Sequence, residues 1–284
     1  MTESSELVRT LQQPHWREAA HHWHDYGSPL RPCAADVGAM EEFVRRWCPN
    51  HRTRPVKALL WGVTPEIAAM AWPDGTELLA VDKSRPMIQH VWPGDIPGRR
   101  KAVCADWFDF VCGTDRYDIV IGDGNFAILD FPRQYRTLAA IARNSLARDG
   151  VLVTRFFLQP AAHEMPGAVF DDLLANRIGS FHSFKLRLAM ALQESALSGV
   201  RMGDVFSAWK RAHVDLEALM AMTGWPQAAI ETIYLFDGKD SRLSFPSAAQ
   251  MEAVMSEHFD KLAVRNLSYE LGERCPILSF RPRG

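Results

Sequence analysis

Five short apolar runs constrain the fold of this chain more than any other feature of its sequence. They cover residues 57–61, 77–82, 101–106, 117–123 and 150–158. Each run is nearly continuous rather than alternating with polar residues, which is typical of a parallel strand buried on both faces. The segments between the runs read as helices or loops, and strands that alternate with helices form a doubly wound parallel sheet. The sequence therefore predicts an α/β core.

One of the connecting segments has a clear helical pattern. Its apolar face is formed by Tyr135, Leu138, Ala139, Ala142 and Leu146, and two arginines at 136 and 143 lie off that face. Asp149 and Gly150 follow, and an Asp-Gly pair is a common stop signal. We therefore expect the helix to continue to this pair and the fifth strand to begin there.

The C-terminal part of the chain has a different pattern. Ser247 and Gln250 form a capping box, which predicts the start of a helix. Two extended runs follow at 262–271 and 276–280, separated by the segment 272–274 with its glycine. Two strands joined by a short glycine-containing turn predict an antiparallel hairpin. The whole sheet is thus expected to have seven strands, mostly parallel, and to end in this hairpin.

The remaining residues read as helical covers on this one core. We expect an N-terminal helical lid at 1–54, the core at 55–158, a helical insertion at 159–246, and the last helix with the hairpin at 247–284. No long Gly/Ser linker separates these parts. The insertion is placed to roof a substrate pocket, but most of its aromatic residues are expected to be ordinary core residues of a helical layer.

Composition and charge narrow the classes of function. Lys plus Arg (32) nearly balance Asp plus Glu (34), so the broad basic surface of a nucleic-acid-binding protein is not expected. No apolar stretch approaches the roughly 20 residues of a membrane helix, and the first residues, MTESSELVRTLQQ, have no signal-like apolar core. We predict a cytoplasmic protein, a monomer or homodimer, whose partner is a small molecule rather than a membrane or nucleic acid.

The cysteines and histidines do not predict a metal site. The five cysteines are scattered and include no CxxC pair, which is also contrary to a disulfide framework. Four histidines gather at positions 15, 21, 22 and 24, but no cysteine or acidic ligands accompany them at a convincing spacing. We therefore predict no metal.

Glycines and acids follow four of the predicted strands. Gly62 follows the first strand, Asp82 and Asp106 end the second and third, and residues 122–125 (Gly-Asp-Gly-Asn) close the fourth. Ligands of parallel sheets bind at these carboxyl ends. The 20 residues from Gly62 to Asp82 suit an acid that accepts hydrogen bonds from a ribose diol. A lone Asp after a strand is more often a turn or cap residue, but two such acids in register favour a nucleoside ligand.

The order of these motifs resembles that of class I S-adenosylmethionine-dependent methyltransferases. The resemblance is carried by the residues at 59–62 (LLWG), 79–87 (LAVDKSRPM), 104–107 (CADW), 117–120 (YDIV) and 149–153 (DGVLV), together with the terminal helix and hairpin. It implies a Rossmann-like fold and S-adenosylmethionine as cofactor. In that family the glycine turn faces the methionine part of the cofactor, and the next two acids hold the ribose hydroxyls and the adenine amino group.

Carried over to this chain, the resemblance assigns these roles to Gly62, Asp82 and Asp106. It implies that Met87 and Trp107 flank the adenine ring, and that Asp123 lies beside the transferable methyl group. Lys83 and Gly124 are predicted as further cofactor contacts. The first turn departs from the family because it holds one glycine, so Thr64 and Glu66 are candidates to bind the amino group of the cofactor. The lack of a GxGxxG motif makes a dinucleotide cofactor a distant alternative.

Catalytic and acceptor-binding candidates come from two regions. Asp123 either orients or deprotonates the acceptor, or caps the following helix. Residues 26–32 either connect two helices or form a lid from which Tyr26 or Arg31 reaches the site. Asn125 and Phe126 follow Asp123 and are candidate acceptor contacts. Arg155 lies in an apolar strand, where it either pairs with a core acid, the favoured reading, or holds a substrate carboxylate.

These features together predict an enzyme that transfers a methyl group from S-adenosylmethionine to a small molecule. Two alternatives stay open. One is another use of the same cofactor, such as transfer or cyclisation of its aminobutyrate arm. The other is a nucleoside-binding protein of the same fold without turnover.

Overall fold

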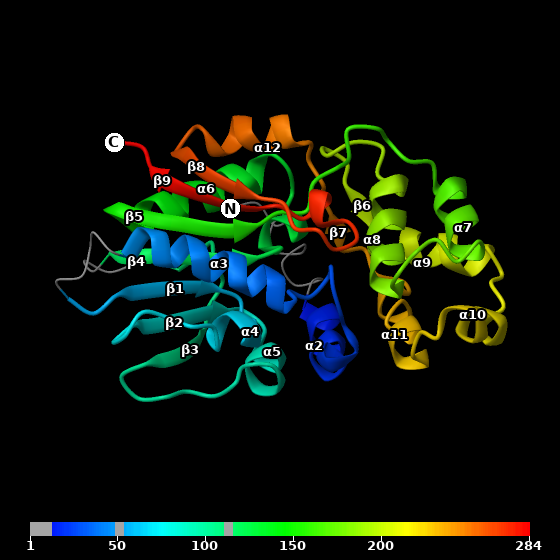
Figure 1. Cartoon of the computed structure of the whole chain (residues 1–284), viewed down its shortest axis with the longest axis horizontal. Helices are drawn as coiled ribbons and strands as arrows, with labels where there is room; N and C mark the ends of the chain where they lie inside the picture. The colour runs from blue at the N-terminus through cyan, green and yellow to red at the C-terminus, as the bar shows by residue number, and fades with distance from the viewer. Residues whose placement is uncertain (1–12, 49–53, 111–115) are drawn as a thin grey trace.

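The computed structural model of the 284-residue chain describes residues 13–48, 54–110 and 116–284. Its centre is a seven-stranded sheet in the order β3-β2-β1-β4-β5-β9-β8 (Figure 1). The strands are β1 (Lys57–Trp61), β2 (Glu77–Asp82), β3 (Arg100–Cys104), β4 (Tyr117–Asp123), β5 (Leu146–Arg155), β8 (Phe259–Arg265) and β9 (Ile277–Pro282). Strands β1 to β5 pair in parallel, and β9 is antiparallel to both β5 and β8. This is the architecture predicted from the sequence.

Helices cover both faces of the sheet because successive strand residues point to opposite sides. Ala58 and Leu60 face one side, which is covered by α3 (Ala34–Trp47), α4 (Pro65–Ala68) and α5 (Arg85–His90). Leu59 and Trp61 face the other side, which is covered by α6 (Arg133–Ser145) and α12 (Ala248–Met255). Figure 1 shows the two helical layers on either side of the strands. The sheet order reverses between β1 and β4, the usual place for a ligand in such a fold.

Several element boundaries differ from those predicted. Helix α6 buries the expected face but ends at Ser145, and β5 begins at Leu146 rather than at Gly150. An irregularity in the β4–β5 pairing lets the strand start early. Strand β3 covers Arg100–Cys104, so Asp106 lies beyond its end. The capping box of Ser247 and Gln250 is present at the start of α12.

The predicted hairpin has the right direction but the wrong connection. Strand β8 begins at Phe259 and ends at Arg265, so the segment before Ile277 is a long loop that contains the short helix η5 (Gly272–Arg274). The loop contains apolar residues because it packs on the core. Leu267 lies against the sheet-face cluster and Leu271 is buried among the residues of the insertion.

Residues 159–246, called the cap below, contain five helices beside the sheet (Figure 1). They are α7 (Pro166–Leu174), α8 (Phe181–Leu192), α9 (Met202–Arg211), α10 (Leu216–Thr223) and α11 (Gln227–Glu231), with the short helix η4 (Tyr234–Phe236) and the two-stranded sheet of β6 (Val200–Arg201) and β7 (Arg242–Leu243). The predicted core aromatics Phe181, Phe184, Phe206 and Trp209 are buried together, and Phe170 packs against them. The cap thus has its own hydrophobic core.

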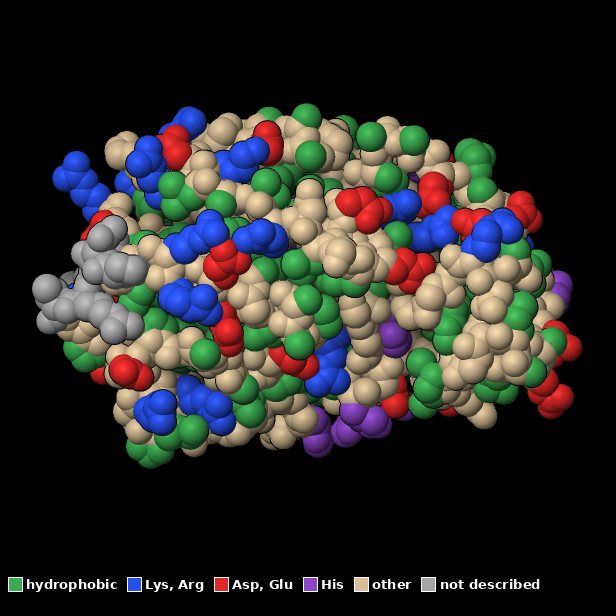
Figure 2. Space-filling model, in the orientation of Figure 1, with side chains coloured by type: hydrophobic (Ala, Val, Ile, Leu, Met, Phe, Trp, Pro, Cys, Tyr) green, Lys and Arg blue, Asp and Glu red, His purple; other side chains and the backbone are tan. Residues whose placement is uncertain are grey.

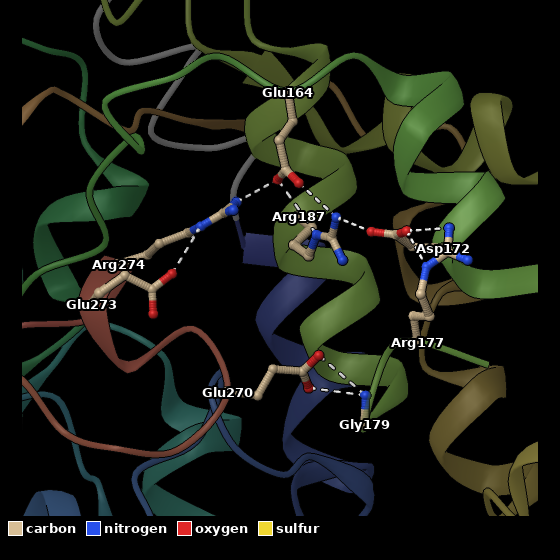
Figure 3. A network of polar contacts seen from close by, with 8 residues as sticks. All are labelled: Glu164, Asp172, Arg177, Gly179, Arg187, Glu270, Glu273 and Arg274. Carbon is tan, nitrogen blue, oxygen red and sulfur yellow. Dashed lines mark hydrogen bonds and ion pairs between the residues drawn. The ribbon is translucent and has the colours of Figure 1, made fainter. Parts of the chain in front are cut away.

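Ion pairs fasten the cap to the β8–β9 loop (Figure 3). Arg187 of α8 donates to Glu164 at 2.5 Å and to Asp172 of α7 at 2.7 Å. Glu164 also accepts from Arg274 of the loop at 2.6 Å. On the surface, acidic and basic side chains alternate over α7 and α8 (Figure 2). The network joins two segments of the chain that are distant in sequence, and so fixes the position of the cap beside the strand ends.

The N-terminal segment lies between the cap and the core. It consists of α2 (Gln13–His21), the short helix η1 (Trp23–Asp25) and the turn that leads to α3. Glu18 of α2 pairs with Lys239 of the cap at 2.9 Å, and α2 also contacts α5 of the core. Within the described residues, no helix combines the length and the apolar character that crossing a bilayer requires.

Candidate active site

A cavity of about 470 Å³ opens at the carboxyl ends of β1, β2 and β4. Three parts of the chain line it: the strand ends, the N-terminal segment and the cap. Among the predicted site residues, those that line it are Tyr26, Gly62, Thr64, Asp82, Lys83, Met87, Asp106, Trp107, Asp123, Gly124 and Asn125. The reversal of strand order therefore brings most of the predicted residues into one cavity.

Gly62 and Asp82 lie together at the ends of neighbouring strands. Gly62 has a φ of +93°, a backbone conformation that favours glycine, and its N–H donates to the carbonyl of Val81 at 2.9 Å. The Asp82 carboxylate accepts from the N–H of Ser84 at 2.7 Å. Burial raises the pKa of Asp82 to about 6, and the charge of Asp106 adds to the rise, whereas the Ser84 hydrogen bond and Lys83 oppose it. This carboxylate can accept further hydrogen bonds, and further donors would stabilise its charged form.

The second acid follows β3 beside an aromatic ring. Asp106 accepts from the N–H of Phe108 at 3.0 Å, and its carboxylate lies 3.6 Å from the ammonium of Lys83. The Trp107 indole donates to the carbonyl of Val81 at 2.7 Å, which fixes its ring against β2. Met87 of α5 is buried in the same wall. This end of the cavity thus combines an oriented carboxylate with apolar surfaces, a combination that suits a planar base with an amino group.

Asp123 is held in a buried ion-pair network at the end of β4. Arg155 donates to its two oxygens at 2.6 and 3.1 Å, and also to Asp36 of α3 at 3.1 Å. Tyr269 of the β8–β9 loop accepts from Arg155 at 3.1 Å and donates to Asp36 at 2.7 Å. Desolvation works against the charge of Arg155, but Asp123 and Asp36 raise its pKa well above the usual value. Burial raises the pKa of Asp123, and the guanidinium opposes that rise.

The favoured reading of Arg155 is therefore the one observed: it pairs with core acids and does not line the cavity. Arg31 and Glu66 form an ion pair with each other, and neither lines the cavity. Phe126 is fully buried and stacks on Phe156, with ring centroids 4.8 Å apart. The sequence predicts that these residues lie near the site, but it does not reveal which side chains they contact.

Asn125 is oriented by its neighbours. Its side-chain oxygen accepts from the Thr154 hydroxyl at 3.2 Å and lies so close to Gly122 that a Cβ there would be 2.5 Å away. The Asn125 amide nitrogen is buried and has no hydrogen-bond partner among the described residues. The amide thus keeps one donor for a ligand or a water.

The cavity is closed by residues that the sequence did not single out. The N-terminal segment contributes Trp16, Ala19, Trp23 and Leu30 beside the predicted Tyr26, and the cap contributes Leu186, Met202, Phe236, Leu243 and Phe245. Their signal was the density of tryptophans before residue 24 and the apolar insertion, but neither pattern says which side chains face a ligand. Among the described residues, no group of three or more His, Cys, Asp or Glu side chains is placed to hold a metal ion.

Comparison with known proteins gives the fold a name. No protein-family model matches the sequence, and no curated protein matches it either. Among solved structures, the chain is similar to a putative Zn-dependent alcohol dehydrogenase from Rhodobacter sphaeroides, with a TM-score of 0.60 and 11% identity over 96% of this chain and 99% of that one. It is also similar to the CcbJ methyltransferase from Streptomyces caelestis, with a TM-score of 0.54 and 14% identity over 94% and 96%.

A third similar structure is the magnesium protoporphyrin IX methyltransferase from Synechocystis PCC 6803, solved with bound S-adenosylhomocysteine. Its TM-score is 0.52, with 10% identity over 97% of this chain and 100% of that one. The chain therefore has the class I S-adenosylmethionine-dependent methyltransferase fold, as its motifs predict. Because the identities are low and the names span two enzyme classes, the likeness establishes the fold and not the reaction.

Proposed function

We propose that this protein binds S-adenosylmethionine in the strand-end cavity and transfers its methyl group to a small molecule. The observation that carries the proposal is that four residues after successive parallel strands line one cavity. They are Gly62 after β1, Asp82 at the end of β2, Asp106 after β3 and Asp123 at the end of β4. The similar Synechocystis enzyme, crystallised with S-adenosylhomocysteine, supports the choice of cofactor.

The cofactor roles follow from the contacts already described. Asp82 has one oxygen on the Ser84 N–H and is otherwise open to the cavity, so it is suited to accept the two hydroxyls of a ribose. Asp106 is suited to accept from the adenine amino group, with Met87 and Trp107 beside the ring. Gly62 leaves room for the methionine arm, and Thr64, Lys83 and Gly124 are further contacts in this arrangement.

Methyl transfer asks the protein mainly for alignment and exclusion of water. When bound, S-adenosylmethionine would supply a methyl group on a sulfonium; the acceptor atom would form its bond to that carbon as the bond to sulfur breaks, and sulfur would keep the electron pair. Asp123 already binds Arg155 through both oxygens, so we assign it a positioning role as a hydrogen-bond acceptor rather than that of a free base. Asn125 offers its unused amide donor to the acceptor.

The covers complete this arrangement. Within the predicted N-terminal lid, 1–54, we assign the lid role to the segment before α3, because α3 itself covers the sheet. We assign 55–158 as the cofactor-binding core, 159–246 as a cap over the acceptor, and 247–284 as the completion of the core. Tyr26 lies where the lid and the cap meet at the cavity. The free cysteines of the described residues, two of them buried, support a cytoplasmic location for this reaction.

The proposal is tested by incubating the protein with S-adenosylmethionine labelled in its methyl group and a small-molecule extract. We expect S-adenosylhomocysteine to accumulate together with a labelled product of low mass. Methylthioadenosine in its place would indicate reaction at the aminobutyrate arm, and binding without any product would indicate a protein without turnover. Either result contradicts the proposal.

A further inference from the structure

A buried lysine lies directly behind the cap end of the cavity. Lys185 of α8 is 1% exposed, and its ammonium donates to the Thr232 hydroxyl at 2.6 Å. The same nitrogen lies 4.5 Å from the centroid of the Tyr26 ring and 5.3 Å from that of Phe236. Both rings line the cavity, as does the next residue of the helix, Leu186. The ammonium is therefore separated from the cavity by one layer of aromatic side chains.

Within the described part of the chain, no carboxylate lies within ion-pairing distance of this ammonium. The Asp25 carboxylate, one residue before Tyr26, binds His22 and His24 instead, at 3.0 and 3.3 Å. A buried charge without a counter-ion is costly, and an anion on a bound ligand would offset that cost.

The other titratable groups that face Lys185 carry no negative charge near neutral pH. The His182 ring stacks on the Tyr26 ring with centroids 5.7 Å apart, and its Nε2 bonds the Asp25 carbonyl at 2.9 Å. Burial, and the charge of Lys185, lower the pKa of His182 to about 4, so it is neutral. Burial and Asp25 raise the pKa of the Tyr26 phenol above its usual value, so it keeps its proton.

The cap end of the cavity itself is apolar. Its walls come from Leu30, Leu186, Met202, Phe236, Leu243 and Phe245, and from Ala127 and Phe157 at the strand ends. None of these side chains carries a charge. A ligand that fills this space must therefore be largely apolar. Two cations line the cavity elsewhere, and each pairs with a carboxylate: Lys83 with Asp106 at 3.6 Å and Arg133 with Asp130 at 3.2 Å. Lys185, behind Tyr26 and Phe236, has no carboxylate partner among the described residues.

We propose that the cap end of the cavity is the acceptor subsite, and that it takes a largely apolar molecule bearing an anionic group, for which Lys185 supplies the counter-charge. This inference rests on the proposed function for the word acceptor, but the binding preference itself does not. It also gives a role to a buried cation that the proposed cofactor contacts do not use.

Burial lowers the pKa of Lys185 to about 7, so about half of the lysine side chains carry a charge at pH 7. An anion in the cavity stabilises the charged form and raises the pKa. The sign of the pH effect follows: the lysine is charged below pH 7 and loses its charge as the pH rises. Affinity for an anionic ligand should therefore fall between pH 6 and pH 8.5, whereas affinity for a neutral analogue should not change.

Three probes of nearly the same shape test the proposal: 2-naphthoate, its uncharged amide 2-naphthamide, and the cation 2-naphthylmethylammonium. Their affinities are measured by calorimetry with and without saturating S-adenosylhomocysteine. We expect 2-naphthoate to bind at least tenfold more tightly than the amide at pH 6, with the cation weakest. The preference should shrink at least fivefold at pH 8.5. Equal binding of acid and amide, tighter binding of the cation, or no binding of any probe would overturn the proposal.

The variant Lys185→Met removes the charge and keeps the length of the side chain. It should bind acid and amide within threefold of each other, with unchanged affinity for S-adenosylhomocysteine. Lys261→Met is the matched control. This exposed lysine lies on the edge strand β8, where it pairs with Glu252, so its replacement should leave the preference intact. A preference for the acid that survives in Lys185→Met refutes the role of the lysine. If that variant does not fold, the pH dependence of the wild-type protein still decides.

The wild-type titrations also separate this inference from the proposed function. Selective binding of 2-naphthoate without binding of S-adenosylhomocysteine would support the anionic subsite and contradict the methyl-transfer proposal. The reverse result would retain the cofactor site and reject the anionic subsite.

Discussion

Replacing Asp82 with Asn should weaken cofactor binding and at the same time stabilise the protein without ligand. The two effects have one cause, the buried and desolvated carboxylate. Its pKa is raised from 3.8 to about 6, and two units correspond to about 3 kcal/mol, an upper bound for the cost of keeping it ionised in the fold. Asn keeps the acceptor oxygen for the Ser84 N–H and carries no charge.

We therefore expect Asp82→Asn to unfold about 2–6 °C above the wild type at pH 8, since 1 kcal/mol moves the midpoint of a protein of this size by roughly 2–4 °C. The native wild type takes up a proton as the pH falls from 6 towards 4, before the unfolded chain does. Its stability relative to the variant thus recovers over this range, and the difference should vanish near pH 4. Thermal melts from pH 4 to pH 8 measure it.

Calorimetry with S-adenosylhomocysteine measures the loss of cofactor affinity in Asp82→Asn. Loss of a charged acceptor for two hydroxyls should weaken binding at least tenfold, because hydrogen bonds to charged groups are each worth about 1.5–3 kcal/mol. The control is Asp118→Asn, whose carboxylate binds Arg54 and the Lys57 N–H away from the cavity. It should lower the melting temperature and leave the affinity unchanged. Wild-type affinity in Asp82→Asn, or a lower melting temperature at pH 8, would refute the reasoning.

Three further experiments test other parts of the site. Asp106→Asn should weaken S-adenosylhomocysteine binding less than Asp106→Ala, because Asn keeps an acceptor for the adenine amino group; equal losses would remove this residue from adenine recognition. Arg155→Met leaves two buried acids unpaired and should cost about 3–5 kcal/mol in denaturant unfolding, with a smaller loss at low pH; a stable variant would show that the network is dispensable. Deleting residues 1–32 should keep the circular dichroism of the sheet but lower turnover more than tenfold, whereas full turnover would make the segment a bystander.

The sequence predicted the central strands well because their patterns are local. The predicted bounds of β1, β2 and β4 match the observed ones. The prediction of the β8–β9 connection was wrong because its apolar residues pack against parts of the chain that are distant in sequence. Leu267 and Leu271 are apolar since the loop packs on the core, and Tyr269 reaches Asp36 and Arg155. A run of such residues looks like a strand until the contacts are known.

The candidate site shows the same limit. Glycines and acids at strand ends are visible in sequence, because the topology alone brings the ends of parallel strands to one edge. Side-chain partners are not visible: Arg31 and Glu66 occupy each other, and Asp123 and Arg155 form a pair. The position of Lys185 behind Tyr26 depends on how α8 packs against the N-terminal segment, a contact between residues more than 150 positions apart.

A crystal structure of the protein soaked with S-adenosylhomocysteine tests the central claim most directly. We predict the ribose hydroxyls on Asp82, the adenine amino group at Asp106 beside Trp107, and the sulfur directed towards the cap end of the cavity. A nucleoside bound elsewhere, or a cavity in which Asp82 makes no contact with a ribose, would contradict the account.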